Sequence, residues 1–279
     1  MSTALPQVNP WRPLGTCTPA ACVRDPLAAV GRARRAARLL GALAVVLAGV
    51  PVAIAARLCR TDHDRARLTR SWARLMLRVL GIGLDVHGTA PAGELLVANH
   101  TSWLDPLVIA ATVPSRPLAK REVAGWPVVR ILVAGAGALF IDRERLLTLP
   151  SAVADVAGAL RAGDTVVAFP EGTTWCGRAM GGFRPAVFQA AIDAGAPVRP
   201  VVLRYREGGA ASTRACFVGD DSLLASLLRV TATRDLAVEV TLLAPEPPPP
   251  AARGRWARAE LAEIVEARVR ADVPLCHAP

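Results

Sequence analysis

Between Gly83 and Leu243, short apolar runs alternate with longer segments of helical spacing. The run 95–98 has the length of a buried strand, and it leads into a polar turn that ends at Asp105-Pro106, a typical helix start. This alternation constrains the fold, because parallel strands need crossover helices between them. The sequence therefore predicts an α/β domain with a mostly parallel central sheet flanked by helices. We expect strands at 84–88, 95–98, 117–120, 138–141, 165–169, 198–205 and 236–243, and helices at 123–133, 149–161, 183–194, 222–230 and 253–270.

Changes in composition divide the chain of 279 residues into four regions. Residues 1–23 are rich in proline and small residues, and we expect them to be disordered or loosely packed. Residues 24–80 are predicted to form a membrane-anchoring segment, and 81–245 the α/β domain. Residues 246–279 are predicted to form a proline-rich linker and a closing helix.

The stretch 39–56 has no charged residue and is just long enough to span a bilayer. A cleaved signal peptide is the alternative, but the arginine-rich segment before the run is too long for one. Arginines crowd both ends of the run, so the positive-inside rule gives no orientation. A re-entrant or interfacial hairpin that bends at Pro51 fits this pattern, and a full span fits it too.

Residues 62–80 are predicted to form a basic amphipathic helix. Apolar residues recur at helical spacing and arginines fill the other positions, which is typical of a helix on an anionic membrane. An ordinary surface helix packed on the domain is the alternative. The apolar set is Leu68, Trp72, Leu75, Met76 and Val79, and the basic set is Arg67, Arg70, Arg74 and Arg78.

The net charge of +10 indicates an anionic partner. Aromatic residues make up only 4% of the chain and are not interleaved with basic ones, which argues against nucleic acid. The six cysteines contain no C-x-x-C pair and look scattered, which predicts neither a zinc site nor a disulfide framework. A reduced protein that faces the cytoplasm fits this cysteine usage, with Cys176 as a small filler residue rather than a nucleophile.

His100 and Asp105 are the candidate catalytic pair. They follow the strand 95–98, at the end of a strand where α/β proteins bind ligands. An imidazole there can accept a proton from a hydroxyl if a carboxylate holds its other nitrogen. The alternative is that His100 ends a strand and Asp105 caps a helix.

Further stretches accompany this pair in a fixed order. They are 139–143 (Leu-Phe-Ile-Asp-Arg), 166–173 (Val-Val-Ala-Phe-Pro-Glu-Gly-Thr) and 196–202 (Ala-Pro-Val-Arg-Pro-Val-Val). Together with His-x-x-x-x-Asp they resemble the motifs of the glycerolipid acyltransferase family, which includes the 1-acylglycerol-3-phosphate acyltransferases. The resemblance covers roughly residues 70–245 and implies transfer of an acyl chain to a lyso-lipid hydroxyl. Acyl-CoA or an acyl carrier protein would be the co-substrate, and neither a further cofactor nor a metal is expected.

The resemblance also implies an acceptor site. Arg143 would bind the anionic head group, Glu171, Gly172 and Thr173 would shape the pocket, and Arg184 would add a second positive charge. Thr174 departs from the pattern, since many glycerol-phosphate-specific members have arginine there. A lyso-lipid with a less charged or zwitterionic head, such as lyso-ornithine lipid, is therefore the alternative acceptor.

Two alternatives to acyl transfer are a serine hydrolase and a protein without enzymatic activity. Ser102 near His100 could suggest a serine hydrolase, but the nucleophile elbow Gly-x-Ser-x-Gly is absent from the sequence. A non-enzymatic basic membrane-binding protein would need neither His100 and Asp105 nor Glu171. The expected location is the cell membrane, with the catalytic domain facing the cytoplasm and an anionic membrane surface as partner.

Overall fold

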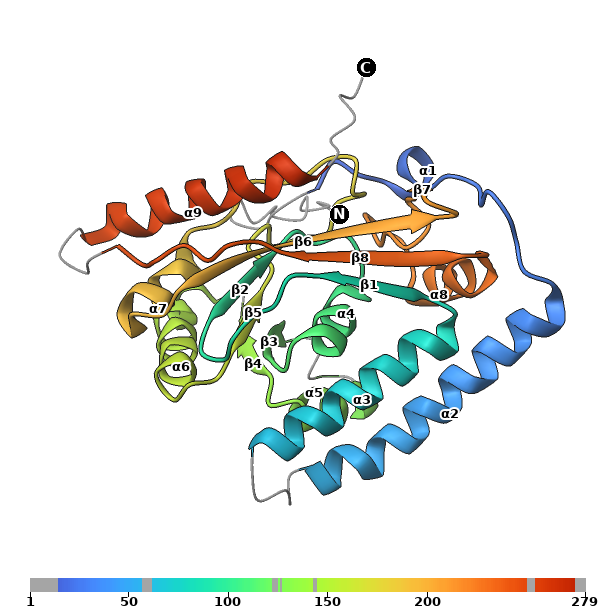
Figure 1. Cartoon of the computed structure of the whole chain (residues 1–279), viewed down its shortest axis with the longest axis horizontal. Helices are drawn as coiled ribbons and strands as arrows, with labels where there is room; N and C mark the ends of the chain where they lie inside the picture. Colours follow the sequence, from blue (N-terminus) through green and yellow to red (C-terminus); the bar gives the residue numbers. More distant parts are fainter. Residues whose placement is uncertain are drawn as a thin grey trace, which may run out of the picture.

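The computed structural model describes residues 15–56, 62–121, 125, 127–142, 145–249 and 254–273. In these ranges an eight-stranded sheet lies between two layers of helices (Figure 1). The strands are β1 (Gly83–His87), β2 (Leu95–Ala98), β3 (Arg116–Lys120), β4 (Leu139–Ile141), β5 (Val166–Ala168), β6 (Val198–Glu207), β7 (Ala210–Ala211) and β8 (Leu236–Leu242). The helices are α1 (Pro19–Cys22), α2 (Arg32–Ala56), α3 (Asp62–Leu80), α4 (Asp105–Thr112), α5 (Pro127–Gly135), α6 (Leu149–Arg161), α7 (Ala186–Ala194), α8 (Leu223–Ala232) and α9 (Gly254–Asp272).

The strand order is β1-β8-β6-β2-β5-β3-β4, and β7 pairs with β6. Pairing is parallel throughout except between β6 and β8 and between β6 and β7. The predicted α/β class with a mostly parallel sheet is thus confirmed. The antiparallel β8 makes the sheet mixed, which the sequence pattern did not indicate.

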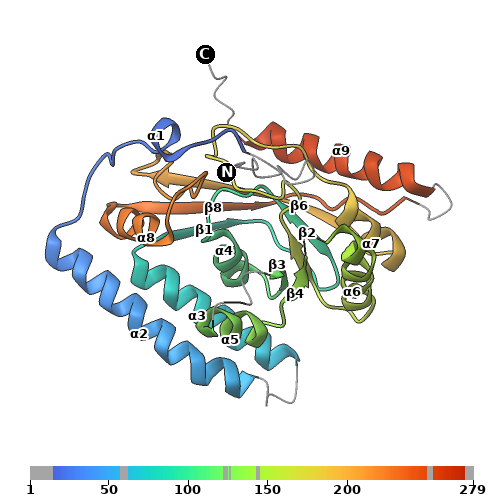
Figure 2. The same cartoon turned by 180° about the vertical axis from the view of Figure 1, so that it is seen from behind.

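Side chains of the central strands alternate between two hydrophobic cores. Leu96 and Ala98 of β2 join the core beneath α3 and α4, whereas Leu95 and Val97 join the core beneath α6, α7 and α9. This alternation is the two-residue period of a strand that is buried on both faces. Seen from behind in Figure 2, α9 lies on one side of the sheet and the hairpin of α2 and α3 on the other.

Helices α2 and α3 pack as a hairpin against α4 and α5. Of the two alternatives for the apolar run, the hairpin that bends at Pro51 does not match the structure, because α2 continues through Pro51 to Ala56. Residues 57–61, which join α2 to α3, lie outside the described residues. Gly49 allows the two helices to approach closely, since a Cβ there would come within 2.5 Å of Trp72. The predicted helix at 62–80 is confirmed.

The buried face of α3 agrees with the predicted one only in part. Met76 is buried and Trp72 and Val79 pack against the core, as predicted. Ala73, Leu77 and Leu80 are buried in the core as well, and Leu75 is exposed. Arg70 and Arg74 donate hydrogen bonds to the carbonyls of Ala111 and Thr112, the last residues of α4 and therefore without helical partners of their own. These two arginines thus stabilise a helix end, and α3 is part of the domain core.

Part of the N-terminal region is also packed, contrary to the expectation of disorder. Cys17 is buried, and α1 begins at Pro19 after Thr18, whose hydroxyl caps the helix. Leu27 and Ala28 donate backbone hydrogen bonds to Glu207 at the end of β6. Residues 15–30 therefore belong to the folded domain, and residues 1–14 lie outside the described residues.

Candidate active site

The polar turns after β2 and β5 meet because these strands are parallel neighbours in register. Leu95 pairs with Val166 and Val97 with Ala168, so the chain leaves both strands at the same edge of the sheet. Asn99 continues the β2 pairing with β6 through its side chain, which donates to the Leu203 carbonyl at 3.0 Å and accepts from the Leu203 N–H at 2.8 Å. These bonds fix the position of the following residue, His100.

His100 and Asp105 are in direct contact, as the sequence predicted. The distance from His100 Nδ1 to Asp105 Oδ2 is 2.8 Å. Because a carboxylate accepts, Nδ1 carries the proton and Nε2 is left as the basic nitrogen. The imidazole stacks on the ring of Phe169, with 4.3 Å between ring centroids, and is 18% exposed. The pair therefore has the geometry of a general base with its orienting carboxylate.

Asp105 is fully buried, and hydrogen bonds satisfy both of its oxygens. Oδ2 also accepts from the backbone N–H groups of Thr101 at 2.7 Å and Ser102 at 2.8 Å. Oδ1 accepts from the Tyr205 hydroxyl at 2.7 Å. These donors compensate for the loss of water around the buried carboxylate and hold it in place beside the imidazole.

Tyr205 is a functional residue that the sequence analysis missed. It lies on β6, and its side chain is on the same face of the sheet as Val201 and Leu203. Burial raises the pKa of Tyr205 well above 10, and the charge of Asp105 raises it further, so the hydroxyl remains a donor. The available signal was the two-residue period of β6, which places Tyr205 on the face that carries α4.

Glu171 lies beneath the site and joins its two turns. Its Oε1 accepts from the His100 backbone N–H at 2.6 Å and its Oε2 from the Gly181 N–H at 2.7 Å. Burial raises the pKa of Glu171 to about 8, and the nearby charge of Asp105 also raises it, while the N–H donors of Gly181 and His100 and the charge of Arg270 lower it. Glu171 thus holds the backbone of His100 in place. The sequence predicted a different role for it, in the acceptor site.

Ser102 is buried and occupied by structural hydrogen bonds. Its hydroxyl oxygen accepts from the Leu104 N–H at 3.2 Å, and its side chain also bonds to Tyr205. This geometry agrees with the exclusion of a serine hydrolase, since a nucleophilic serine must be exposed to its substrate.

Three backbone N–H groups of the turn after β2 are not available as an oxyanion hole. The N–H groups of His100, Thr101 and Ser102 all donate to the carboxylates of Glu171 and Asp105. Donors that already have partners cannot also stabilise a developing negative charge. Stabilisation of the tetrahedral intermediate must therefore come from other groups.

The remaining predicted residues are distributed around this centre. Gly172 has a φ of 75°, which favours glycine, and Thr173 next to it is half-buried. The side chain of Arg184 is exposed, and its backbone N–H donates to the Pro170 carbonyl at 3.0 Å. Arg143 lies outside the described residues. The Thr174 hydroxyl donates to the Phe217 carbonyl, which holds it in the protein rather than toward solvent.

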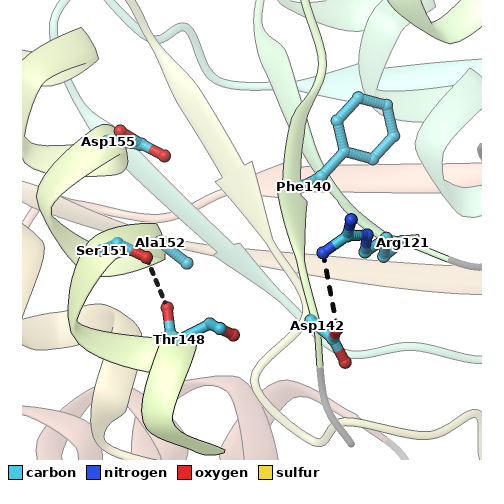
Figure 3. Close-up of a pocket in the computed structure, with 7 residues that line it drawn as sticks. All are labelled: Arg121, Phe140, Asp142, Thr148, Ser151, Ala152 and Asp155. Carbon is cyan, nitrogen blue, oxygen red and sulfur yellow. Dashed lines mark hydrogen bonds and ion pairs between the residues drawn. The ribbon is translucent and has the colours of Figure 1, made fainter. Parts of the chain in front are cut away.

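A separate hollow of about 340 Å³ opens beside the block that precedes Arg143 (Figure 3). Arg121 Nη1 lies 3.6 Å from Asp142 Oδ2 on one wall, and Asp155 projects from α6 on the other. The hollow therefore has charges of both signs. His100, Asp105 and Glu171 are not among the residues that line it.

The four cysteines in the described residues lie together, although all six look scattered along the sequence. Cys17, Cys176 and Cys216 are buried together in a small cluster, and Cys22 packs against it. Chain spacing gave no sign of this, because the cluster joins segments that lie far apart in the sequence.

The arrangement so far defines a class: an α/β protein with a hydrogen-bonded histidine–aspartate pair at the edge of its sheet. Comparison with known proteins supplies the family. The acyltransferase family model matches residues 84–204. Lyso-ornithine lipid O-acyltransferase of Pseudomonas aeruginosa is 37% identical over 244 residues, which cover 85% of this chain and 91% of that protein.

Two further relatives agree. The 1-acyl-sn-glycerol-3-phosphate acyltransferase of Neisseria meningitidis is 36% identical over 181 residues, covering 64% of this chain and 71% of that protein. The crystal structure of the 1-acyl-sn-glycerophosphate acyltransferase PlsC from Thermotoga maritima superposes with a TM-score of 0.62 at 21% identity, over 86% of this chain and 96% of that one. The chain belongs to the acyltransferase family and is an enzyme of acyl transfer. The resemblance found in the sequence is confirmed.

Proposed function

We propose that this acyltransferase moves an acyl chain from an acyl thioester to the free hydroxyl of a lyso-lipid. The observation that carries the proposal is the 2.8 Å contact between His100 Nδ1 and Asp105 Oδ2, in a chain of the acyltransferase family. In the reaction, Nε2 accepts the hydroxyl proton as the oxygen attacks the thioester carbonyl. The thiolate then leaves and takes the proton from the imidazolium, and Asp105 stabilises the imidazolium between the two steps.

Acyl-CoA and acyl carrier protein both supply a thioester, and either serves this scheme. A thiolate is a good leaving group, so no acyl-enzyme intermediate is needed. The buried and bonded Ser102 supports a direct transfer, because it is not available as a nucleophile.

The first candidate acceptor is 1-acylglycerol-3-phosphate. The Neisseria relative is named for this substrate, and the net charge of +10 favours an anionic lipid. Arg143 and Arg184 are proposed to offset the phosphate monoester, as guanidinium groups bind phosphate through paired hydrogen bonds.

Lyso-ornithine lipid is the second candidate, and two observations favour it. The Pseudomonas relative named for this substrate covers most of the chain. The hollow beside the block 139–143 contains Arg121, Asp142 and Asp155, so it can match both charges of a zwitterionic head group. This assignment assumes that the head group binds beside that block.

A membrane location is also part of the proposal. Residues 32–55 form a helix that is long and apolar enough to cross a bilayer, and only 22% of its most apolar window is buried. Leu40, Leu43, Leu47 and Ile54 of α2 are exposed large apolar side chains. We propose that this face contacts the membrane, that basic side chains nearby bind an anionic surface, and that the domain faces the cytoplasm, where acyl-CoA and acyl carrier protein occur.

Activity of the full-length protein in detergent tests the reaction. With labelled acyl-CoA and either lyso-lipid, we expect His100→Ala to lower kcat by at least about a thousandfold, a typical contribution of a general base. Asp105→Asn should lower it by a similar order, because the amide cannot stabilise the imidazolium. His87→Ala is the matched control, since His87 is an exposed histidine that contacts Glu239 across β1 and β8. Near-normal turnover of His100→Ala would refute the proposed base.

Competition between the two acceptors decides the head group. Wild type is given equal amounts of both lyso-lipids, and the products are separated by mass. If the hollow binds a zwitterionic head group, Asp155→Asn should raise the KM for lyso-ornithine lipid more than the KM for 1-acylglycerol-3-phosphate. If Asp155→Asn changes neither KM, the hollow does not bind the head group.

A further inference from the structure

Three thiols from two distant parts of the chain converge in the structure. The sulfur atoms of Cys17, Cys22 and Cys176 all lie within 4.8 Å of one another. Cys17 and Cys176 are 6% and 5% exposed, so this is an interior cluster rather than a chance surface grouping. The catalytic scheme uses none of these thiols.

A fourth cysteine borders the group. Cys216 is 2% exposed and packs in the same small core as Cys17 and Cys176. Cys216 is not one of the three cysteines whose sulfurs lie within 4.8 Å of one another, but it is buried in the same core beside them. It is therefore the nearest candidate for a fourth sulfur ligand.

The local backbone supports this convergence. Cys17 precedes α1 and Cys22 is its last residue, and the Cys22 N–H donates to the Thr18 carbonyl at 3.0 Å. This single turn of helix brings both cysteines of the N-terminal segment beside Cys176. Zinc binds cysteine in its thiolate form.

We propose that Cys17, Cys22, Cys176 and Cys216 bind one Zn²⁺ ion as thiolates. Tetrahedral zinc holds sulfur at about 2.3 Å, which puts neighbouring sulfurs roughly 3.8 Å apart. The sulfurs of Cys17, Cys22 and Cys176 already lie within 4.8 Å of one another, close to that spacing. Binding releases the thiol protons to solvent and forms four Zn–S bonds, and it changes no oxidation state.

Four protein ligands leave no open position for substrate, so this zinc is structural rather than catalytic. Its position still affects catalysis. The backbone N–H of Trp175, next to Cys176, donates to the His100 carbonyl at 2.7 Å. The backbone N–H of Phe217, next to Cys216, donates to the Thr101 carbonyl at 2.9 Å. The ion would join the N-terminal segment to both loops that hold the turn of the catalytic histidine.

The alternative to metal binding is that two of these thiols form a disulfide. It would consume two thiols and leave the others free, whereas zinc uses the whole set. Thiolates in a closed site select zinc among the common divalent ions that are not redox-active. The two outcomes differ in metal content and in protein mass.

Metal analysis of the full-length protein tests the proposal. After purification in detergent without chelator and with a reductant, we expect about one zinc per chain, released by a thiol-binding mercurial. Cys17→Ser and Cys176→Ser should each retain less than about a tenth of that zinc, since a serine hydroxyl cannot replace a thiolate ligand at neutral pH. Cys59→Ser, which changes a cysteine outside the set of four, is the control and should retain the wild-type content.

Cobalt substitution of wild type covers the case in which a serine variant does not fold. Co²⁺ bound to thiolates gives an intense ultraviolet charge-transfer band, and its loss on adding zinc would support a shared thiolate site. Absence of both metals, together with a mass two hydrogen atoms lower that marks a disulfide, would overturn the proposal. Unchanged zinc in Cys176→Ser would overturn it as well, and unchanged zinc in Cys216→Ser would remove the fourth ligand.

Discussion

Asp105 shows how a buried carboxylate can serve a base without losing its charge. It accepts three hydrogen bonds on Oδ2 and one on Oδ1, and only one of the four comes from His100. The other three are made whether or not the imidazole is protonated. They hold the carboxylate in place while the charge of the ring changes, which is the preorganisation that makes electrostatic stabilisation effective.

Tyr205→Phe tests this preorganisation. The substitution removes one hydrogen bond to a charged acceptor and preserves the shape of the side chain, a change worth about 1.5–3 kcal/mol. We expect kcat to fall by about tenfold or more with little change in either KM, because Tyr205 is buried against Asp105 and away from substrate. Steady-state kinetics of the purified variant measure this. A raised KM with normal kcat would show that Tyr205 acts on binding instead.

Glu171 should make stability depend on pH. Its pKa is near 8 in the folded protein and near 4.5 in the unfolded chain, so between these values the folded state holds the extra proton. The free energy of unfolding must therefore fall as pH rises from about 5 to 8, by at most about 1.4 kcal/mol per pH unit for one proton. Denaturant titrations across this range should show a steeper decline in wild type than in Glu171→Gln. Equal slopes for the two proteins would mean that Glu171 is already ionised.

The residues that could be foreseen are those with a local signal. His100 and Asp105 lie within one turn of chain, and Glu171 lies in a recognisable motif. Tyr205 and the four clustered cysteines act through contacts across the sheet or between distant loops. No spacing along the chain encodes those contacts, so only the folded arrangement reveals them.

At the scale of elements, α2 combines two faces with different partners. Arg35 and Arg38 donate to the carbonyls of Leu228, Thr231 and Thr233 at the end of α8, which ties one side of α2 to the domain. Leu40, Leu43 and Leu47 are more than half exposed. Their spacing of three and four residues puts them on one side of the helix, as a membrane-facing stripe requires.

Changing that stripe should weaken membrane binding. Each buried leucine contributes about 1.5–3 kcal/mol, so we expect replacement of Leu40, Leu43 and Leu47 by Gln to lower vesicle binding at least about a hundredfold. High salt should weaken binding of wild type only in part, since it screens the arginines and leaves apolar burial intact. Co-sedimentation with anionic vesicles measures both effects. Ile264→Gln on α9, across the sheet from α2, is the matched control, and an equal loss there would refute a specific stripe.

The element ranges were largely foreseen, because amphipathic periods and helix starts are local properties. The roles of the arginines on α3 were not. Arg70 and Arg74 occupy the positions expected of a membrane-binding face, yet they bond to the end of α4. A helical pattern shows which residues share a side but not what lies opposite that side.

The whole molecule does not divide at residue 80, although composition changes there. Helix α3 precedes that point, and its buried face belongs to the same hydrophobic core as α4 and the central strands. The sequence pattern separated the anchor from the catalytic domain because residues 24–80 are basic and apolar, whereas residues 81–245 alternate predicted strands with predicted helices. In three dimensions, the second helix of the anchor is one layer of the catalytic fold.

Deletion of residues 1–80 should therefore prevent folding instead of releasing a soluble enzyme. The deletion removes Met76, Leu77 and Leu80, each at most 4% exposed, and opens the core over α4. Three such side chains contribute roughly 5–9 kcal/mol, which is comparable to the whole stability of a domain. It also removes the arginines that bond to the end of α4. We expect the fragment to aggregate without detergent and to lack a cooperative unfolding transition, measured by size exclusion and circular dichroism. The Leu40, Leu43 and Leu47 variant should keep that transition, since its changed side chains are exposed. A monomeric, active fragment of residues 81–279 would show that α3 is dispensable and that the chain does divide where its composition changes.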